Sequence, residues 1–515
     1  MSIIHSRHAP VALTGLTITE RLFHGLVHRP DDPVMVDGPT GRSLTAGALM
    51  DGIRRLAGGL AAAGFGPGQV VAILAPNMPE YAIAFHGPLW AGGTVTTLNP
   101  SYTATEIHHQ LKNSGAALLI TIPQFLAAAR EGAVGTDVRE IAVMGEAEGL
   151  RSMADLMGSP LAEQVPVDVE RDTAVLPYSS GTTGLPKGVM LTHRNLVVNV
   201  DQKLALMDPV PGGWTVGFLP FFHIYGQTVL MNLHLAAGEG VVTMPRFDLE
   251  LFLRLCAEYR TRNVYCAPPV VVALAKHPMV DQFDLSAVKR LFSGAAPLSG
   301  DLADAVGRRM GVEAVQGYGM TEMSPISHAT PPGGGKSGSI GPLVPNTEAR
   351  IVDPVTGVDV GPGADGELWI RGPQVMKGYH ANAAATASTL TPDGWLRTGD
   401  IATADEDGYF FIRDRLKELI KVSGFLVAPA EVEAALLAHP EVADCAVTSR
   451  PDEAAVEVPV AFVVRAKGSE VTEAEVMAHL AGQLASYKLP RAVTWVDTIP
   501  KSPSGKILRR LLRQG

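Results

Sequence analysis

One stretch rich in glycine and hydroxyl groups constrains this chain more than any other. It spans residues 178–189 and reads Tyr-Ser-Ser-Gly-Thr-Thr-Gly-Leu-Pro-Lys-Gly-Val. The apolar run 173–177 before it predicts a strand, and Thr192 behind it can cap a helix. Backbone N–H groups, hydroxyls and the ammonium of Lys187 can together surround an anion, whereas surface turns seldom combine so many phosphate donors. The stretch therefore predicts a loop that binds the phosphates of a nucleotide triphosphate.

This loop differs from the common P-loop. That motif requires Gly-Lys followed by Ser or Thr, whereas here Pro186 precedes the lysine and Gly188 follows it. Two later glycine patterns match nucleotide motifs by letter only. The first, Gly335-Lys336-Ser337, looks like the end of a P-loop, but Thr330 stands where the first glycine of that motif belongs. The second, residues 361–366, matches a dinucleotide-binding fingerprint, but it leads into a strand-like segment instead of opening a helix. Both are interpreted as turns.

Composition restricts the class of protein. The chain has 515 residues, enough for roughly three domains of about 150 residues, and its 46% hydrophobic and 18% charged content indicates a well-buried globule. The net charge of −10 argues against a general nucleic-acid surface. No apolar run reaches the roughly 18 residues of a membrane span, no signal peptide is recognised, and three cysteines are too few for a disulfide framework. We expect a cytoplasmic protein.

Apolar periodicity predicts two kinds of domain. Residues 45–63 place leucines and an isoleucine on one helical face, and Val70 to Leu74 form a continuous apolar run typical of a buried parallel strand. Such segments alternate to about residue 300, as in a large α/β core. The last hundred residues predict a small α+β domain with strands over 442–447 and 458–464. The charged cluster 413–418 interrupts apolar runs, as a hinge between two domains would.

Two further motifs combine small residues with aromatic and acidic ones. They read Phe292-Ser-Gly-Ala-Ala-Pro and Gln316-Gly-Tyr-Gly-Met-Thr-Glu. Small residues let a backbone approach a flat ring closely, and Tyr318 offers a face for adenine. Thr321 can donate to the α-phosphate, and Glu322 can hold Mg²⁺. Spacing alone would leave both motifs as turns and core packing.

An aromatic cluster surrounds one imidazole in residues 219–226. The histidine, His223, could equally be a core residue with satisfied hydrogen bonds. The stretch contains no carboxylate that could pair with an α-ammonium group, and an unpaired ammonium buried beside Phe222 would be costly. Amino acids are therefore poor candidate substrates.

Taken in order, these motifs resemble those of the adenylate-forming superfamily, which includes acyl-CoA synthetases, 4-coumarate–CoA ligases, luciferases and the adenylation domains of nonribosomal peptide synthetases. The match runs through nearly the whole chain and is closest to 4-coumarate–CoA ligases and related acyl-CoA ligases. It implies a large N-terminal α/β domain of several subdomains, residues 1–414, and a small mobile α+β domain, residues 415–515, with a hinge near Lys417. It also implies ATP, Mg²⁺, coenzyme A and a small carboxylic acid as ligands, no nucleic-acid partner, and a monomer or homodimer.

The resemblance also implies roles for individual residues. The nucleotide would be held by Ser179, Ser180, Gly181, Thr182, Thr183, Gly184, Lys187, Gln316, Gly317, Tyr318, Thr321, Asp400 and Arg415. The acyl pocket would be lined by Tyr225, Phe292, Ala295, Gly319, Pro325 and Ile326. Catalytic roles would fall to Lys506, Lys421, His223 and Thr182, and Glu322 would bind the metal.

The implied reaction has two steps. The acid and ATP give acyl-AMP and pyrophosphate, after which the small domain rotates, Lys506 withdraws and coenzyme A takes the acyl group. The sequence departs from the 4-coumarate–CoA ligase pattern at two positions, where Ser423 replaces a lysine and Leu426 replaces a glutamine. Leucine cannot donate a hydrogen bond, so these departures bear on which acid is bound and on how the thiol is transferred. A fatty acyl-CoA ligase, an acyl-AMP ligase that loads a carrier protein, and a nucleotide-binding regulator without turnover remain alternatives.

Overall fold

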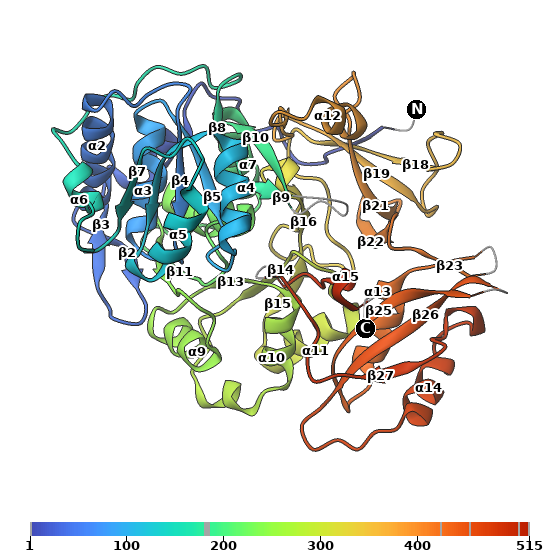
Figure 1. Ribbon diagram of the computed structural model, residues 1–515. Coiled ribbons are helices and arrows are strands. Elements are labelled where there is room, and N and C mark those ends of the chain that lie inside the picture. The colour runs from blue at the N-terminus through green and yellow to red at the C-terminus, as the bar shows by residue number, and fades with distance from the viewer. Residues whose placement is uncertain (1–2, 180–185, 423–424, 453–454, 503–504, 513–515) are drawn as a thin grey trace.

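A computed structural model describes residues 3–179, 186–422, 425–452, 455–502 and 505–512. Its largest sheet lies in the N-terminal part of the chain, at the upper left of Figure 1. In spatial order the strands are β20 (Gly378–Tyr379), β10 (Lys187–Thr192), β8 (Thr173–Val175), β5 (Thr94–Leu98), β4 (Val70–Leu74), β6 (Ala116–Thr121) and β7 (Glu140–Val143), while β9 (Tyr178–Ser179) pairs with β10. From β8 to β7 neighbouring strands run parallel, as the apolar runs predict.

Helices cover both faces of this sheet. Alternate residues of β4 show the two faces: Val71 and Ile73 pack with α2 (Ala46–Ala62) and α3 (Glu80–Trp90), and Ala72 and Leu74 pack with α4 (Ala104–Ser114) and α5 (Leu126–Ala133). Residue 45 caps α2, so the predicted helix over 45–63 is confirmed. Among the described residues, the other helices before residue 240 are α1 (Ile18–Leu26), a 3₁₀ helix (Pro123–Phe125), α6 (Met153–Leu156), α7 (His193–Leu204), a π-helix (Tyr225–Asn232) and α8 (Leu233–Ala236).

The segment between the glycine-rich loop and α7 differs from the prediction. We expected the loop to lead into the helix that Thr192 caps, and the helix and its capping box are present. A six-residue strand, β10, lies between them and pairs antiparallel with β8, β9 and β20. The loop is therefore the connection of an antiparallel strand pair, with β9 on one side and β10 on the other.

Two smaller parallel arrays complete the α/β core. The first joins β11 (Trp214–Gly217), β12 (Gly240–Thr243), β2 (Pro33–Asp37) and β3 (Ser43–Thr45), of which β3 is antiparallel. The second joins β13 (Asn263–Cys266), β14 (Arg290–Ser293) and β15 (Glu313–Gln316) in parallel. Helices α9 (Leu249–Glu258), α10 (Pro268–Lys276) and α11 (Gly300–Met310) lie between these strands in sequence. Both glycine motifs of the candidate site start from the carboxyl ends of β14 and β15.

An antiparallel sheet follows. Its order is β1 (Ile4–His5), β18 (Glu348–Val352), β19 (Gly366–Arg371), β21 (Leu396–Ala404) and β22 (Phe410–Arg415). A two-stranded pair, β16 (Tyr318–Gly319) and β17 (Ile326–His328), and helix α12 (Ala383–Thr389) lie near it in sequence. Strand β19 confirms that the glycine pattern 361–366 is a turn before a strand.

The C-terminal residues form a separate sheet with a core of its own. Figure 1 shows this unit in orange and red at the lower right. It contains β24 (Phe425–Val427), β23 (Ile420–Val422), β26 (Val456–Arg465), β25 (Val442–Asp452) and β27 (Val493–Trp495), with α13 (Pro429–Ala438), α14 (Glu473–Ala481) and α15 (Arg509–Leu512). The predicted fold class, a large α/β part and a small α+β part, is confirmed; the boundary at 414/415 stays a prediction. Among the described residues, no helix is long and apolar enough to cross a bilayer.

Candidate functional site

The two ends of the glycine-rich loop are paired in the structure. Lys187 on β10 stands opposite Ser179 on β9, and the Lys187 Nζ lies 5.0 Å from the ring centroid of Tyr379. The predicted phosphate ligands between them, Ser180, Gly181, Thr182, Thr183 and Gly184, lie outside the described residues. A cavity of about 640 Å³ borders the flanking residues Tyr178 and Pro186 on the side of α4.

Glu322 stands at the same place and is almost fully buried. Its Oε1 accepts hydrogen bonds from Ser179 Oγ at 3.0 Å and from the Tyr379 hydroxyl at 2.8 Å. Thr321 precedes it in a 3₁₀ turn. A buried carboxylate beside hydroxyl groups, next to the loop predicted to bind phosphates, provides the oxygen donors that Mg²⁺ prefers, and phosphates would complete its shell. The residues therefore fit a magnesium ion.

A second carboxylate, Asp400 on β21, is held by two groups. The Tyr318 hydroxyl donates to its Oδ2, and Arg415 on the neighbouring strand lies 3.6 Å from its Oδ1. Burial raises the pKa of Asp400, while the positive charge of Arg415 acts against that shift. Burial and the charge of Asp400 raise the pKa of Tyr318, which therefore stays a neutral donor. Two predicted nucleotide ligands, Tyr318 and Arg415, thus both contact a third, Asp400.

Close backbone packing shapes the space beside Tyr318. A Cβ added to Gly319 would lie 2.0 Å from the Pro325 carbonyl oxygen, so no side chain can occupy this position. A Cβ on Gly317 would lie 3.3 Å from the His328 carbonyl oxygen. The side-chain oxygen of Gln316 accepts from the Leu298 N–H at 2.7 Å, which ties the end of β15 to the loop after β14.

His223 lies where the acid is predicted to bind. Its Nδ1 accepts from the Tyr225 N–H at 3.2 Å. Burial, assisted by the nearby ammonium of Lys506, lowers the pKa of His223 to about 4, so the imidazole is neutral at pH 7. The Tyr225 ring lies against Gly294, where an added Cβ would come 3.1 Å from it. Gly294 was not predicted as a pocket residue, although its position between Phe292 and Ala295 in the motif was a signal.

The remaining predicted pocket residues differ in burial: Phe292 and Pro325 are buried, Ile326 is partly buried and Ala295 is exposed. The Asn199 side chain binds both backbone groups of Ile326, donating to its oxygen at 2.8 Å and accepting from its nitrogen at 3.0 Å. Pro325 precedes it, and Ala295 has a left-handed φ of 71°. The Phe292 ring is only 5% exposed and stacks on Tyr265 at a centroid distance of 4.9 Å. Its ring lies in the core beneath Gly294, and its role as a pocket residue stays a prediction.

Lys506 reaches this site from the C-terminal unit. A Cβ added to Gly505 would lie 3.0 Å from the Ala267 side chain, so the loop that carries Lys506 touches the end of β13. Burial and then the charge of Arg415 lower the pKa of Lys506 to about 8, while Asp400, Glu418 and Glu322 favour its protonated form. The terminal lysine and the N-terminal carboxylates therefore act on one another electrostatically.

The join between the two parts contains a buried ion network. Arg509 donates to Glu418, to both carboxylate oxygens of Glu433 at 2.7 and 2.8 Å, and to the Val447 carbonyl. Lys417, the predicted hinge, is exposed. Lys421 is exposed on β23, where its backbone N–H donates to Glu457 at 2.9 Å. Of the two predicted catalytic lysines, Lys506 lies at the site and Lys421 faces solvent.

Comparison with known proteins places the chain in a family. The family of AMP-binding enzymes matches residues 22–380, and the C-terminal domain of the same enzymes matches residues 431–506. This chain belongs to the AMP-binding enzymes. The chain is 42% identical over 512 residues to 4-coumarate–CoA ligase 3 of Oryza sativa subsp. japonica. The aligned region covers 97% of this chain and 92% of the relative.

Solved structures agree with this family. The anthranilate CoA ligase AuaEII in complex with anthranoyl-AMP superimposes on this AMP-binding enzyme with a TM-score of 0.90 at 26% identity, covering 98% of each chain. ATP-bound MatB from Rhodopseudomonas palustris gives a TM-score of 0.87 at 30% identity, covering 97% of this chain and 99% of its own. The resemblance inferred from the motifs and the fold that it implied are confirmed.

Proposed function

We propose that this AMP-binding enzyme is an ATP-dependent carboxylate–CoA ligase whose acid is an aryl acid of the 4-coumarate type. The relative from Oryza sativa is named for that acid, and the superimposed ligase binds an aryl adenylate. One observation carries the proposal: Lys506 of the C-terminal unit acts on Asp400 and Glu322 of the large part. A cation of one lobe thus lies near carboxylates of the other, where the substrate carboxylate and the triphosphate would have to approach one another.

The first step joins two anions. An oxygen of the acid attacks the α-phosphorus of ATP, the bond to the β-phosphate breaks, and pyrophosphate leaves. Lys187 and Lys506 would offset the negative charge; at an effective dielectric of about 20, one such pair at about 4 Å is worth about 4 kcal/mol before desolvation. Glu322 would hold Mg²⁺, which would neutralise phosphate charge when bound. Asp400 and Arg415 would hold the ribose, with Tyr318 against adenine.

The second step requires a change at the same carbonyl. The thiol of coenzyme A attacks it, the thiol proton is lost, and AMP leaves with its carboxyl–phosphate oxygen bond broken. Lys506 beside this carbonyl would hinder the approach of the thiol, so we propose that the C-terminal unit turns about Lys417 after adenylation. Lys421, exposed on the same unit, would then face the site.

A pyrophosphate-release screen over aryl, cinnamyl and alkyl acids, with and without coenzyme A, tests the proposal. Release that depends on 4-hydroxycinnamate, with formation of its CoA thioester, is the expected result. Preference for long alkyl acids would identify a fatty acyl-CoA ligase, and turnover without consumption of coenzyme A would identify a ligase that loads a carrier protein. Absence of pyrophosphate with every acid would refute the proposal.

A further inference from the structure

Lys203, near the end of α7, is buried without a hydrogen-bond acceptor. Lys203 is only 3% exposed, and its Nζ has no hydrogen-bond partner among the described residues. The Nζ lies 4.0 Å from the ring centroid of Phe292. A ring face attracts an ammonium, but it leaves three N–H donors without acceptors. A buried ammonium in this state is costly, so the position requires an explanation other than packing.

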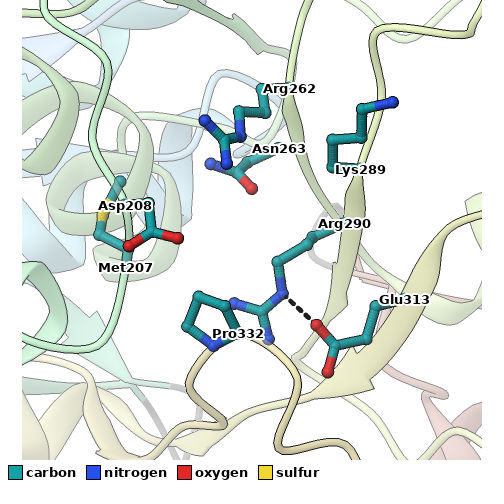
Figure 2. A pocket seen from close by; sticks show the side chains of 8 residues that line it. All are labelled: Met207, Asp208, Arg262, Asn263, Lys289, Arg290, Glu313 and Pro332. Carbon is teal, nitrogen blue, oxygen red and sulfur yellow. Dashed lines mark hydrogen bonds and ion pairs between the residues drawn. The ribbon is translucent and has the colours of Figure 1, made fainter.

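The neighbouring charges do not supply that explanation. The charged side chain that acts on Lys203 is Arg290, another cation, and with burial it lowers the pKa of Lys203 to about 7. Arg290 itself donates to Glu313 at 2.6 Å. Figure 2 shows this pair in a cavity of about 210 Å³ at the amino ends of β13, β14 and β15. Glu313 also accepts from the N–H groups of Gly333 and Gly335, so its carboxylate is already engaged.

Lys203 lies among the residues predicted to bind the acid. Asn199, which holds the backbone of Ile326, stands one helical turn before it on the same face of α7. Phe292, under the ammonium, is two residues before Gly294, which packs on the Tyr225 ring. His223 and Lys506, where the carboxylate would react, act on one another, whereas none of the contacts of Lys203 described above involves either residue. We therefore assign Lys203 to the end of the pocket remote from the chemistry.

A second unpartnered donor lies at the same end. Tyr265 is 2% exposed and stacks on Phe292, and its hydroxyl has no partner within the described part of the chain. Burial raises its pKa, so the hydroxyl stays protonated at physiological pH. Two residues with unpartnered donors, on α7 and β13, thus contact the Phe292 ring. Acceptor oxygens on a bound acid would satisfy these donors.

We propose that Lys203, with the hydroxyl of Tyr265, forms a polar end of the acyl pocket that selects acids carrying a hydrogen-bond-accepting oxygen, such as a phenolic hydroxyl, opposite the reacting carboxylate. The inference rests on the proposed function and names the feature of the acid that the enzyme recognises. A site built to bond an oxygen rejects the analogue that lacks it, because its own donors are then left unpaired.

The test compares 4-hydroxycinnamate with cinnamate in pyrophosphate release. The wild type should prefer the hydroxylated acid in kcat/KM by about tenfold or more. Lys203→Met keeps the length of the side chain and removes the donor, so it should lower kcat/KM for 4-hydroxycinnamate about 10- to 100-fold and change cinnamate by less than about threefold. Lys276→Met, an exposed lysine on α10, is the matched control and should change neither.

Other outcomes are equally informative. Lys203→Gln keeps a donor and should retain part of the discrimination, and Tyr265→Phe should lose a smaller part. Equal kcat/KM values of the wild type for 4-hydroxycinnamate and cinnamate would overturn the inference, whether or not the variants fold. An equal change of kcat/KM for both acids in Lys203→Met would overturn it as well. Turnover that is normal but indifferent to the hydroxyl refutes only this inference; no turnover with any acid refutes the proposed function, and this inference with it.

Discussion

Replacing Lys506 by arginine should change the pH dependence of adenylation. Burial lowers the pKa of Lys506 to about 8, so the ammonium loses its proton within the working range of the enzyme. Only the protonated form can offset the charge that gathers on the carboxylate and the phosphate. Adenylation should therefore decline as pH rises through about 8. Arginine stays protonated at every practical pH, so Lys506→Arg should remove this decline even if its absolute rate is lower.

The magnitude follows from the position of the pKa. With a pKa of about 8, about ten protonated lysines stand for each neutral one at pH 7, and the ratio is reversed at pH 9. The kcat/KM of the first half-reaction reports the free enzyme, so it should fall about tenfold from its plateau by pH 9 and tenfold more by pH 10. Lys506→Met should lower it about 10²–10³-fold at pH 7, the scale for losing one transition-state partner.

The assay is pyrophosphate release from acid and ATP without coenzyme A, from pH 6 to 10, with Mg²⁺ in excess. Leaving out coenzyme A removes the titration of its thiol. Lys501→Arg, on the same segment and paired with Asp444 at 2.6 Å, is the control and should keep the wild-type profile. Thioester formation from supplied acyl-AMP should be largely unaffected in Lys506→Met.

Two results would refute this reasoning. The first is an alkaline decline in Lys506→Arg with the same midpoint as in the wild type, because another group would then be titrating. The second is an equal loss of both half-reactions in Lys506→Met.

The stability of the fold depends on pH in the opposite direction to activity. Between about pH 8 and 10.5 the unfolded chain binds more protons at Lys506 than the folded chain does. The contribution of this lysine to the free energy of unfolding therefore rises with pH, while the rate of adenylation falls.

Three further predictions concern the join, the metal and a buried imidazole. Arg509→Met leaves the Glu433 carboxylate without its arginine and should lower the free energy of unfolding by about 3–5 kcal/mol. Arg491 is exposed, so Arg491→Met should change it by less than about 0.5 kcal/mol. Urea unfolding of both variants measures the two values. Glu322→Gln should raise the Mg²⁺ concentration that half-saturates pyrophosphate release about tenfold or more, and an unchanged Mg²⁺ titration would contradict the metal assignment. Burial lowers the pKa of His86 to about 3, so the unfolded chain binds more protons and stability should fall as pH drops from about 6.5; equal unfolding free energies at pH 7 and pH 5 would contradict this.

The sequence predicted those structural features that depend only on residues close together in the chain. The capping box at Thr192 and the apolar run of β4 need only neighbouring residues, and both are present. Strand β10 escaped prediction because its three partners each pair with only two of its residues: β9 with 187 and 188, β20 with 189 and 190, and β8 with 191 and 192. Of these partners, β20 lies nearly two hundred residues away in sequence. Propensity over six residues that include a glycine does not contain that information.

The candidate site shows the same division. Motifs predicted a set of nucleotide ligands, of which Tyr318, Asp400 and Arg415 lie close together, but not the other groups that hold the site residues. Tyr379, which donates to Glu322, stands outside every motif. Polar residues on α7 would ordinarily face solvent, yet Asn199 and Gln202 bond the backbone of buried segments from the other end of the large domain. Lys203 is buried on the same helix without such a bond, and the helical pattern alone would have placed it at the surface.

The contacts across the join bear on how the second step begins. Arg509 binds Glu418, Glu433 and Val447, all of which follow Lys417, so this network would move with the C-terminal unit as one body. Asp414 precedes Lys417, and its Oδ2 accepts from the Ala430 N–H at the start of α13 at 2.9 Å. Rotation about Lys417 would therefore keep the arginine network and break the bond to α13.

That bond joins the two parts at the stage where Lys506 is in place. Burial raises the pKa of Asp414, so the carboxylate depends on its N–H donors and on the charge of Arg509 to remain ionised. A helix amino terminus favours such a carboxylate by about 0.3–1 kcal/mol at a surface and by more when it is partly buried. A contact of this size would favour the arrangement with Lys506 at the site and would break at low cost if the C-terminal unit turned. The geometry at Asp414, rather than the exposed side chain of Lys417, is thus where the balance between the two steps of the reaction is expected to be set.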